Sequence, residues 1–281
     1  MHKIRRDKIM INTFLQDEIR LVVSNNSLVE QRSVWRRGII DNNGVHTLSR
    51  YMSGQIPYYY REPNNIAKDF LEQHDALYLI ADMCRKAPTD EHHRCTHFAE
   101  ILACVYIQKV LGLKILMRKL TQLTAENTNV HKMDVMCVDT QCLPYRYYWI
   151  EVKSSRQNDS KVYHRHGIYK QMVDSLEHYS VSDKRFDFIQ IRDNLTTTDF
   201  NTSEYNAIRA ELIPPGPKVI YQGLAVINIC TINQQDDDYM LTKPSATNFD
   251  AKILALTDIK ATAVNAYSTL EGILKVAEDG E

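Results

Sequence analysis

The chain has 281 residues, 44% of them hydrophobic, enough to bury a substantial core in one large domain or two small ones. No stretch approaches the roughly 20 uninterrupted apolar residues that a membrane span requires, so a globular cytoplasmic protein is expected. The formal net charge of −1 argues against a protein that grips DNA unaided through a large basic surface. The six cysteines show no regular framework, and several lie in apolar segments, which is typical of reduced thiols rather than disulfides.

The first predicted region covers residues 1–64. It mixes short apolar runs with turn chemistry at Asn42-Asn43-Gly44, and it ends at Pro63 and a pair of asparagines. We therefore expect an N-terminal accessory region here and a main domain over residues 65–281, with one continuous domain as the alternative.

The order of elements after residue 64 predicts the fold class. Residues 65–83 have helical spacing, and the next helix is expected to be capped by Thr96 and stopped by Gly112. A polar loop, QQDDD, is expected before the last helix. The further expected elements, in chain order, are strand 113–120, strand 130–139, strand 145–155, helix 167–179, strand 186–193, strand 218–230 and helix 258–277. This order predicts an α/β (α+β) fold with a central mixed β-sheet flanked by helices and a C-terminal helix.

Charged residues occupy unusual positions in three of these elements. Side chains alternate across a strand, so Glu151 and Lys153 point to the same face. Asp134 lies among apolar residues of the neighbouring strand, where a carboxylate is costly to bury unless a lysine or a metal lies nearby. Glu100 belongs to a helix that is apolar on nearly all sides and is expected to press against the sheet. Three acids and a lysine are thus expected to converge on one edge of the core.

This set of side chains indicates a metal-assisted hydrolysis. Mg2+ prefers oxygen ligands and uses one or two carboxylates together with waters and substrate phosphate, a role that suits Asp134 and Glu151. Mn2+ takes the same ligands and is the alternative cation. Lys153 is positioned to orient the attacking water and to stabilise negative charge.

The combination of Glu100 on a helix, Asp134 on a strand and Glu151-Val152-Lys153 on the next strand resembles the PD-(D/E)xK superfamily of restriction-endonuclease-like nucleases. Met133 stands where the proline of that name usually lies, a departure that many members share. Within the superfamily, the segments HFAEIL, KMD, IEVKSS and SLEHY are similar to the HamA nuclease subunits of bacterial Hachiman antiphage systems, over about residues 50–230.

That resemblance implies a fold, an activity and a partner. It implies a restriction-endonuclease-like core and a Mg2+-dependent deoxyribonuclease, with Glu100 as a further metal ligand beside Asp134 and Glu151. It also implies a partner helicase, HamB, and a nuclease that is held in check until the helicase meets suitable DNA.

Other interpretations of the same residues stay open. The four residues could belong to a degenerate nuclease fold that only binds a helicase or DNA, or to a coincidental salt-bridged edge of a sheet. A second acid-x-lysine triplet, Asp258-Ile259-Lys260, competes with the first. Because the sequence after it is helical, Asp258 is better interpreted as a helix N-cap.

Weaker features border the motif. The basic run from Lys153 to Lys170 is either a solvated loop or a phosphate-contacting segment, and Arg156 belongs to it. Lys170 and Gln171 could contact the scissile phosphate, with an exposed helix face as the alternative.

Two further clusters have competing interpretations. Zinc would accept the ligand types found in one short segment, but their spacing lacks the paired arrangement of a convincing site, and a polar loop with His97 pointing toward the nuclease site is the alternative. The run Tyr58-Tyr59-Tyr60 could stack on bases, although tyrosines in a turn more often pack. The possible zinc ligands are Cys84, His92, His93, Cys95 and His97.

Overall fold

The computed structural model describes residues 15–24, 31–39, 45–61, 63–72, 76–84, 87–123, 133–157, 167–197, 200–242 and 249–278. The strands are β1 (Leu15–Ser24), β2 (Gln31–Ile39), β3 (Lys114–Arg118), β4 (Val135–Asp139), β5 (Arg146–Ser154), β6 (Val219–Asn228) and β7 (Asp250–Leu256). The helices are α2 (Val45–Ser53), α3 (Pro63–Glu72), α4 (Ala76–Cys84), α5 (Glu91–Lys109), α6 (Ile168–Val181), α7 (Arg185–Asn194), α8 (Thr202–Glu211), α9 (Gln234–Thr242) and α10 (Ile259–Glu278). Short 3-10 turns are η1 (Ile56–Tyr59), η2 (Lys119–Gln122) and η3 (Ile229–Thr231).

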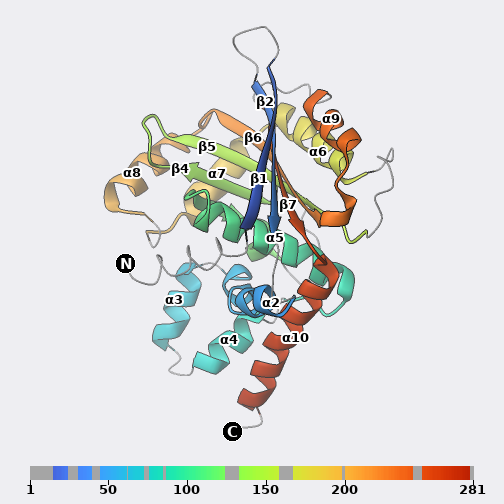
Figure 1. The fold of residues 1–281 in the computed structure, drawn as a ribbon. Coiled ribbons are helices and arrows are strands. Elements are labelled where there is room, and N and C mark those ends of the chain that lie inside the picture. Colours follow the sequence, from blue (N-terminus) through green and yellow to red (C-terminus); the bar gives the residue numbers. More distant parts are fainter. Residues whose placement is uncertain are drawn as a thin grey trace.

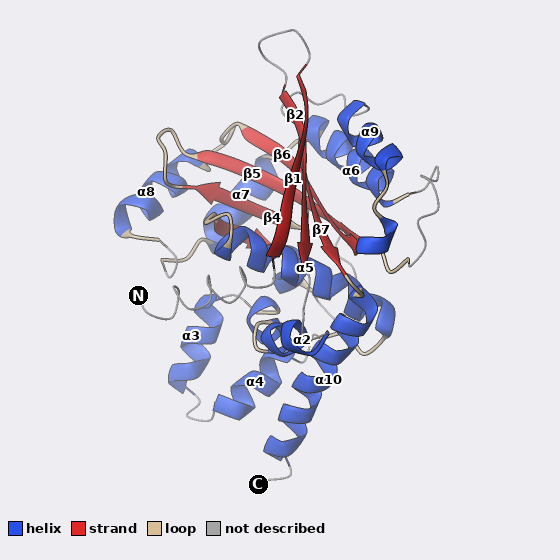
Figure 2. Ribbon diagram, in the orientation of Figure 1, coloured by secondary structure: helices blue, strands red, loops and turns tan. Residues whose placement is uncertain are grey.

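The described strands form one seven-stranded mixed sheet in the order β1-β2-β7-β6-β5-β4-β3. The central strands β5, β6, β7 and β2 are parallel, whereas β3, β4 and β5 pair antiparallel and β1 pairs antiparallel with β2. Helices lie on both faces of this sheet (Figures 1 and 2). The predicted α/β class with a restriction-endonuclease-like core is therefore confirmed.

Two hydrophobic cores lie on opposite faces of the sheet. Ile150 and Val152 of β5 pack into the core that includes α2, α5 and α10, whereas Trp149 packs into the core that includes α6, α7 and α9. This alternation follows from the pleat of a strand, whose successive side chains point to opposite faces. Glu151 therefore belongs to the same face of β5 as Trp149, and its neighbours determine how its charge is accommodated.

Residues 186–193 were predicted as a strand, and this prediction is wrong, because they lie in α7. The alternation of apolar residues suggested a strand with Phe186 and Phe188 on one face. In the structure Phe188 and Ile191 are buried at helical spacing while Phe186 is 85% exposed. The helical period, rather than the alternating one, matches the buried residues.

Other boundaries also differ from the predictions. Helix α5 begins at Glu91, where the Asp90 side chain accepts a hydrogen bond from the His93 N–H at 3.0 Å, and not at Thr96. Of the predicted helix 65–83, residues 65–72 lie in α3 and residues 76–83 in α4, and the QQDDD segment begins α9 instead of forming a loop. Asp258 accepts a hydrogen bond from the Ala261 N–H at 2.9 Å, so its interpretation as an N-cap is confirmed. The expected turn at 42–44 lies outside the described residues.

The region expected to be an accessory layer contributes two strands to the central sheet. Strand β2 pairs in parallel with β7, and the Ser33 hydroxyl donates a 2.9 Å hydrogen bond to Asp250 Oδ1 across this pair. Helix α2 packs beside α10, with Ser49 Oγ donating to the Thr262 carbonyl at 3.0 Å. The described part of residues 1–64 is thus continuous with the main sheet and its helical layer.

In the part of the chain that the structure describes, none of the helices combines the length and the apolar character that crossing a membrane would need.

Candidate active site

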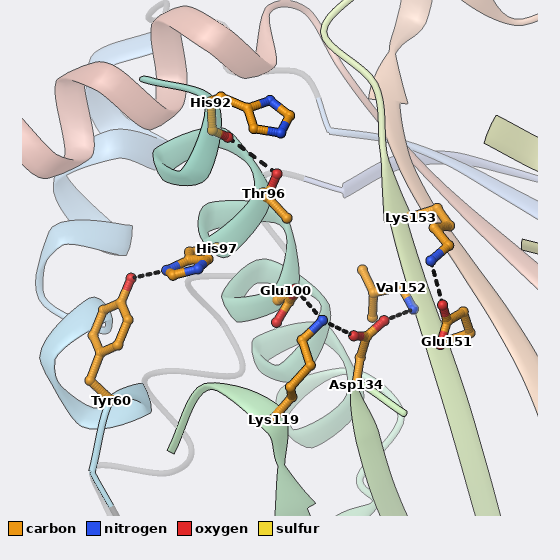
Figure 3. Close-up of polar contacts among 10 residues, drawn as sticks. All are labelled: Tyr60, His92, Thr96, His97, Glu100, Lys119, Asp134, Glu151, Val152 and Lys153. Atoms are coloured by element: carbon orange, nitrogen blue, oxygen red, sulfur yellow. Dashed lines mark hydrogen bonds and ion pairs between the residues drawn. The ribbon is translucent and has the colours of Figure 1, made fainter. Parts of the chain in front are cut away.

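The candidate site forms where β4 pairs with β5, next to α5. The two strands are antiparallel with Val135 opposite Ile150, and continuing that register by one residue places Asp134 opposite Glu151. Helix α5 packs on β5 and carries Glu100 near its middle. Figure 3 shows Glu100 and Asp134 beside the Lys119 ammonium, and Glu151 paired with Lys153 across Val152 of β5.

Asp134 is fixed by contacts through both carboxylate oxygens. It is 3% exposed, its Oδ2 accepts the Val152 N–H at 2.6 Å, and its Oδ1 accepts the Lys119 ammonium. The Lys119 backbone N–H also donates to the Asp134 carbonyl at 2.9 Å. The buried Asp134 carboxylate, which is expected to need a cation, is therefore paired with the ammonium of Lys119.

Lys119 was not predicted as part of the site. Its Nζ lies 2.9 Å from Glu100 Oε1 as well as against Asp134, so one ammonium bridges two acids (Figure 3). A signal was present, because Lys119 lies near the end of the predicted strand 113–120, and the β3–β4 register sets Arg118 opposite Val135. Continuing that antiparallel register brings Lys119 beside Asp134.

Glu151 and Lys153 share one face of β5 as predicted. Lys153 Nζ lies 2.5 Å from Glu151 Oε1, while the side chain of Lys153 remains 27% exposed. The second oxygen, Glu151 Oε2, is buried and has no hydrogen-bond partner among the described residues. Leaving a buried carboxylate oxygen without a partner is costly, so this atom has an unmet need for a cation or a donor.

The electrostatics of the site oppose ionisation of two of its acids. Burial, and after it the nearby Asp134 carboxylate, raises the pKa of Glu151 to about 7. Burial also raises the pKa of Glu100 to about 7, although Lys119 acts in the opposite direction. Burial disfavours the charge of Lys119, but Glu100 and Asp134 outweigh it and raise the pKa of Lys119 above its usual range. Crowded carboxylates with raised pKa values favour the binding of an additional cation.

The oxygen ligands of the site fit a Mg2+ ion held by one or two carboxylates. Asp134 and Glu151 supply hard oxygens, and Glu151 Oε2 is already without a partner. Within the described ranges, no three His, Cys, Asp or Glu side chains gather in a way that could hold a metal ion. A three-carboxylate cage that includes Glu100 is therefore not preformed, because Lys119 lies between Glu100 and Asp134.

His97 does not contact the four site residues through its Nδ1 atom, which lies 3.0 Å from the Tyr60 hydroxyl. Tyr60 in turn bonds the Tyr267 hydroxyl at 2.7 Å, and Figure 3 shows His97 turned toward Tyr60 on the side away from Asp134. Burial lowers the pKa of His97 to about 3, with a contribution from His93. His97 is thus a neutral, buried histidine in a tyrosine network.

The possible zinc ligands have other surroundings in the structure. The His93 Nδ1 lies 2.6 Å from Asp90 Oδ2 at the start of α5, and Cys95 is buried. Among the described residues, these side chains do not form a group of three or more that could hold a metal ion. In the tyrosine run, Tyr59 and Tyr60 are buried and Tyr58 is 49% exposed, which agrees with a packing role for the first two.

The weaker substrate-binding candidates lie at the surface in contacts of their own. Lys170 forms an ion pair with Asp174 one turn along α6, and Gln171 is exposed on the same helix. Arg156 donates to Glu91 Oε1 at 2.8 Å, which ties the end of β5 to the start of α5. Much of the basic run between Lys153 and Lys170 lies outside the described residues.

The chain is a restriction-endonuclease-like protein. It has a mixed sheet with helices on both faces, an acid opposite an acid-x-lysine strand, and a further acid on the preceding helix. The family model HamA matches residues 8–263, and the chain therefore belongs to the HamA family. This membership associates it with Hachiman antiphage defence. A search of curated proteins found no match.

Proposed function

We propose that this chain is a metal-dependent DNA nuclease that hydrolyses phosphodiester bonds in a bacterial antiphage defence system. The observation that carries the proposal is the position of Asp134 opposite the Glu151–Lys153 segment of β5, with Glu151 Oε2 buried and unpartnered among the described residues. Lys119 joins Asp134 to Glu100 of α5. Family membership supports the defence role.

Each residue has a distinct part in the proposed reaction. Asp134 and Glu151 would hold a Mg2+ ion, with Mn2+ as the alternative, and Glu100 would be a further ligand. When bound, the cation acts as a Lewis acid that lowers the pKa of a bound water and neutralises charge on the phosphodiester. Lys153 orients the attacking water with its ammonium and stabilises the negative charge that develops. The Val152 N–H fixes Asp134 through its 2.6 Å bond, so the carboxylate is already oriented.

The proposed nuclease works with a helicase partner of the HamB type. A formal net charge of −1 gives little electrostatic attraction for DNA, and a partner that delivers DNA removes the need for a large basic surface. The isolated chain is therefore expected to cleave weakly.

Cleavage of plasmid DNA in Mg2+, with and without the partner and ATP, tests the proposal. Glu151→Ala and Lys153→Ala should each abolish cleavage. Lys252→Ala is the matched control, because Lys252 also follows an acid two residues earlier on a strand of the same sheet and lies 2.8 Å from it. A Lys153→Ala protein that cleaves as well as the parent would refute the assignment of the site.

The second candidate function is a catalytically inactive module that binds a helicase partner or DNA. It is favoured by Lys119, which bridges two acids that a metal would need. If the intact chain takes up no Mg2+ or Mn2+ and cleaves nothing with partner and ATP present, this second function replaces the first.

A further inference from the structure

Lys119 is a second cation in the candidate site, and its position differs from that of Lys153. Its side chain is 12% exposed, compared with 27% for Lys153, and it reaches the acids from η2, on the other side of Asp134 (Figure 3). It contacts two carboxylates, Glu100 and Asp134, whereas Lys153 forms its ion pair with Glu151.

We propose that Lys119 is a built-in counter-ion that competes with a divalent cation for Glu100 and Asp134, so that full metal binding requires its ammonium to withdraw. This inference rests on the proposed function, because it concerns the same metal site. It goes beyond that function by naming a residue that controls whether the site can be loaded.

The contacts at the two proposed principal ligands support the competition. Asp134 has both oxygens engaged, one by the Val152 N–H and one by Lys119. Glu151 has one oxygen engaged by Lys153 and the other without a partner among the described residues. Glu151 Oε2 therefore has no ligand to displace, whereas Asp134 Oδ1 already binds the Lys119 ammonium.

Electrostatic repulsion prevents the Lys119 ammonium and a divalent cation from binding the same carboxylate oxygen together. An ammonium and a divalent ion bound to the same carboxylate oxygen would lie within a few ångströms of each other, and at such separations like charges in a buried site repel strongly. Lysine can leave without a backbone change, because its ammonium is carried on a flexible four-carbon stem.

A purely structural ion pair and a competing counter-ion predict different responses to metal. If Lys119 only stabilises the fold, its removal lowers the unfolding temperature by the same amount with and without metal. If it competes, its removal leaves Glu100 and Asp134 without a cation, and an added divalent ion takes over the neutralisation. Metal then restores more stability to the variant than to the parent.

The experiment compares the full chain with its Lys119→Met variant, which keeps the length of the side chain and removes the charge. The matched control is Lys114→Met, because Lys114 lies on the adjoining strand β3 and pairs with Glu204 at 2.6 Å, away from the site. Thermal unfolding is measured in EDTA and in Mn2+, and Mn2+ binding is measured by calorimetry. Neither readout requires nuclease activity.

The Lys119→Met protein should bind Mn2+ at least tenfold more tightly than the parent, which corresponds to about 1.4 kcal/mol. Its unfolding temperature should be lower than that of the parent in EDTA and should rise more on addition of Mn2+. The Lys114→Met protein should show the same Mn2+-induced rise as the parent. A variant that folds only in Mn2+ also supports the proposal.

Equal or weaker Mn2+ binding by Lys119→Met overturns the inference. The proposed nuclease site is still supported in that case if the parent binds Mn2+ and the Glu151→Gln variant does not. Failure of the parent and Lys119→Met to bind Mn2+ overturns the proposed metal-dependent function and this inference with it. If Lys119→Met does not fold in either condition, Glu100→Gln is compared with Glu100→Gln/Lys119→Met, which removes one negative and one positive charge together. Tighter Mn2+ binding by the double variant supports the competition, and equal or weaker binding refutes it.

Discussion

Glu151→Gln is expected to stabilise the metal-free protein at alkaline pH while abolishing nuclease activity. Glu151 is 4% exposed, and burial followed by the nearby Asp134 carboxylate raises its pKa from 4.5 to about 7. Glutamine preserves the shape of the side chain and removes the charge that the site disfavours. A stabilising substitution at a residue needed for activity is typical of strained functional sites.

The magnitude follows from the pKa difference. Below pH 4.5 the Glu151 carboxyl is protonated in both the folded and the unfolded chain. Between pH 4.5 and about 7 the unfolded chain releases this proton while the folded chain keeps it, so the free energy of unfolding falls as pH rises. At about 1.4 kcal/mol per pH unit, the full difference corresponds to roughly 3 kcal/mol above pH 7. The pKa of about 7 already includes the opposing effect of Lys153, which favours the charged carboxylate, so the expected net gain is roughly 3 kcal/mol.

The assay is urea unfolding in EDTA at about pH 8 and at about pH 4.5, for the parent and Glu151→Gln. The variant should be more stable than the parent near pH 8 and no more stable near pH 4.5. Glu91→Gln, at a half-exposed glutamate, is the control and should show no such gain at either pH. If Glu151→Gln is not stabilised near pH 8, or is stabilised equally at both pH values, the buried charge is not the cause and the reasoning fails.

Three further substitutions test the fold around the site. Asp134→Asn should lower the free energy of unfolding by roughly 2 kcal/mol, because the buried Lys119 loses a charged acceptor, and urea unfolding that shows no loss would contradict this contact. Asp90→Ala should cost about 1 kcal/mol by removing the side-chain cap of α5, measured by the same unfolding experiment with metal binding unchanged. Gly216→Ala should cost about 1–3 kcal/mol, because its φ of 81° disfavours a side chain and the added Cβ would meet the ring of Phe188. An unaltered melting temperature for Gly216→Ala would show that this loop adapts freely.

Most of the candidate site could be predicted from the sequence because its geometry depends on local rules. The two-residue period of a strand sets Glu151 and Lys153 on one face, and an acid within an apolar strand or helix draws attention by its cost of burial. Lys119 was missed because a lysine after a strand is ordinary in sequence. Only the register between β3 and β4 brings it to Asp134.

The rest of the fold depended on pairings that no local pattern reveals. The short segment 186–193 suits a strand by alternation, but tertiary packing buries Phe188 and Ile191 on one side of a helix. The strands β1, β2 and β7 were not predicted as parts of one sheet, because β2 finds its neighbour far along the chain. The pairing of strands that lie so far apart in the sequence depends on how all the elements pack around the core.

The parallel pairing of β2 with β7 ties the completion of the sheet to the synthesis of residues 250–256. Ser33 and Asp250, which hydrogen bond across that pair, are separated by 217 residues. A growing chain on the ribosome has made α5, β4 and β5, and with them every residue of the candidate site, before β7 exists. Until then β6 has an open edge and the β1–β2 hairpin has no neighbour to pair with, and closing so long a loop is slow. The finished sheet, and with it the complete support for the site, therefore forms only after β7 has emerged.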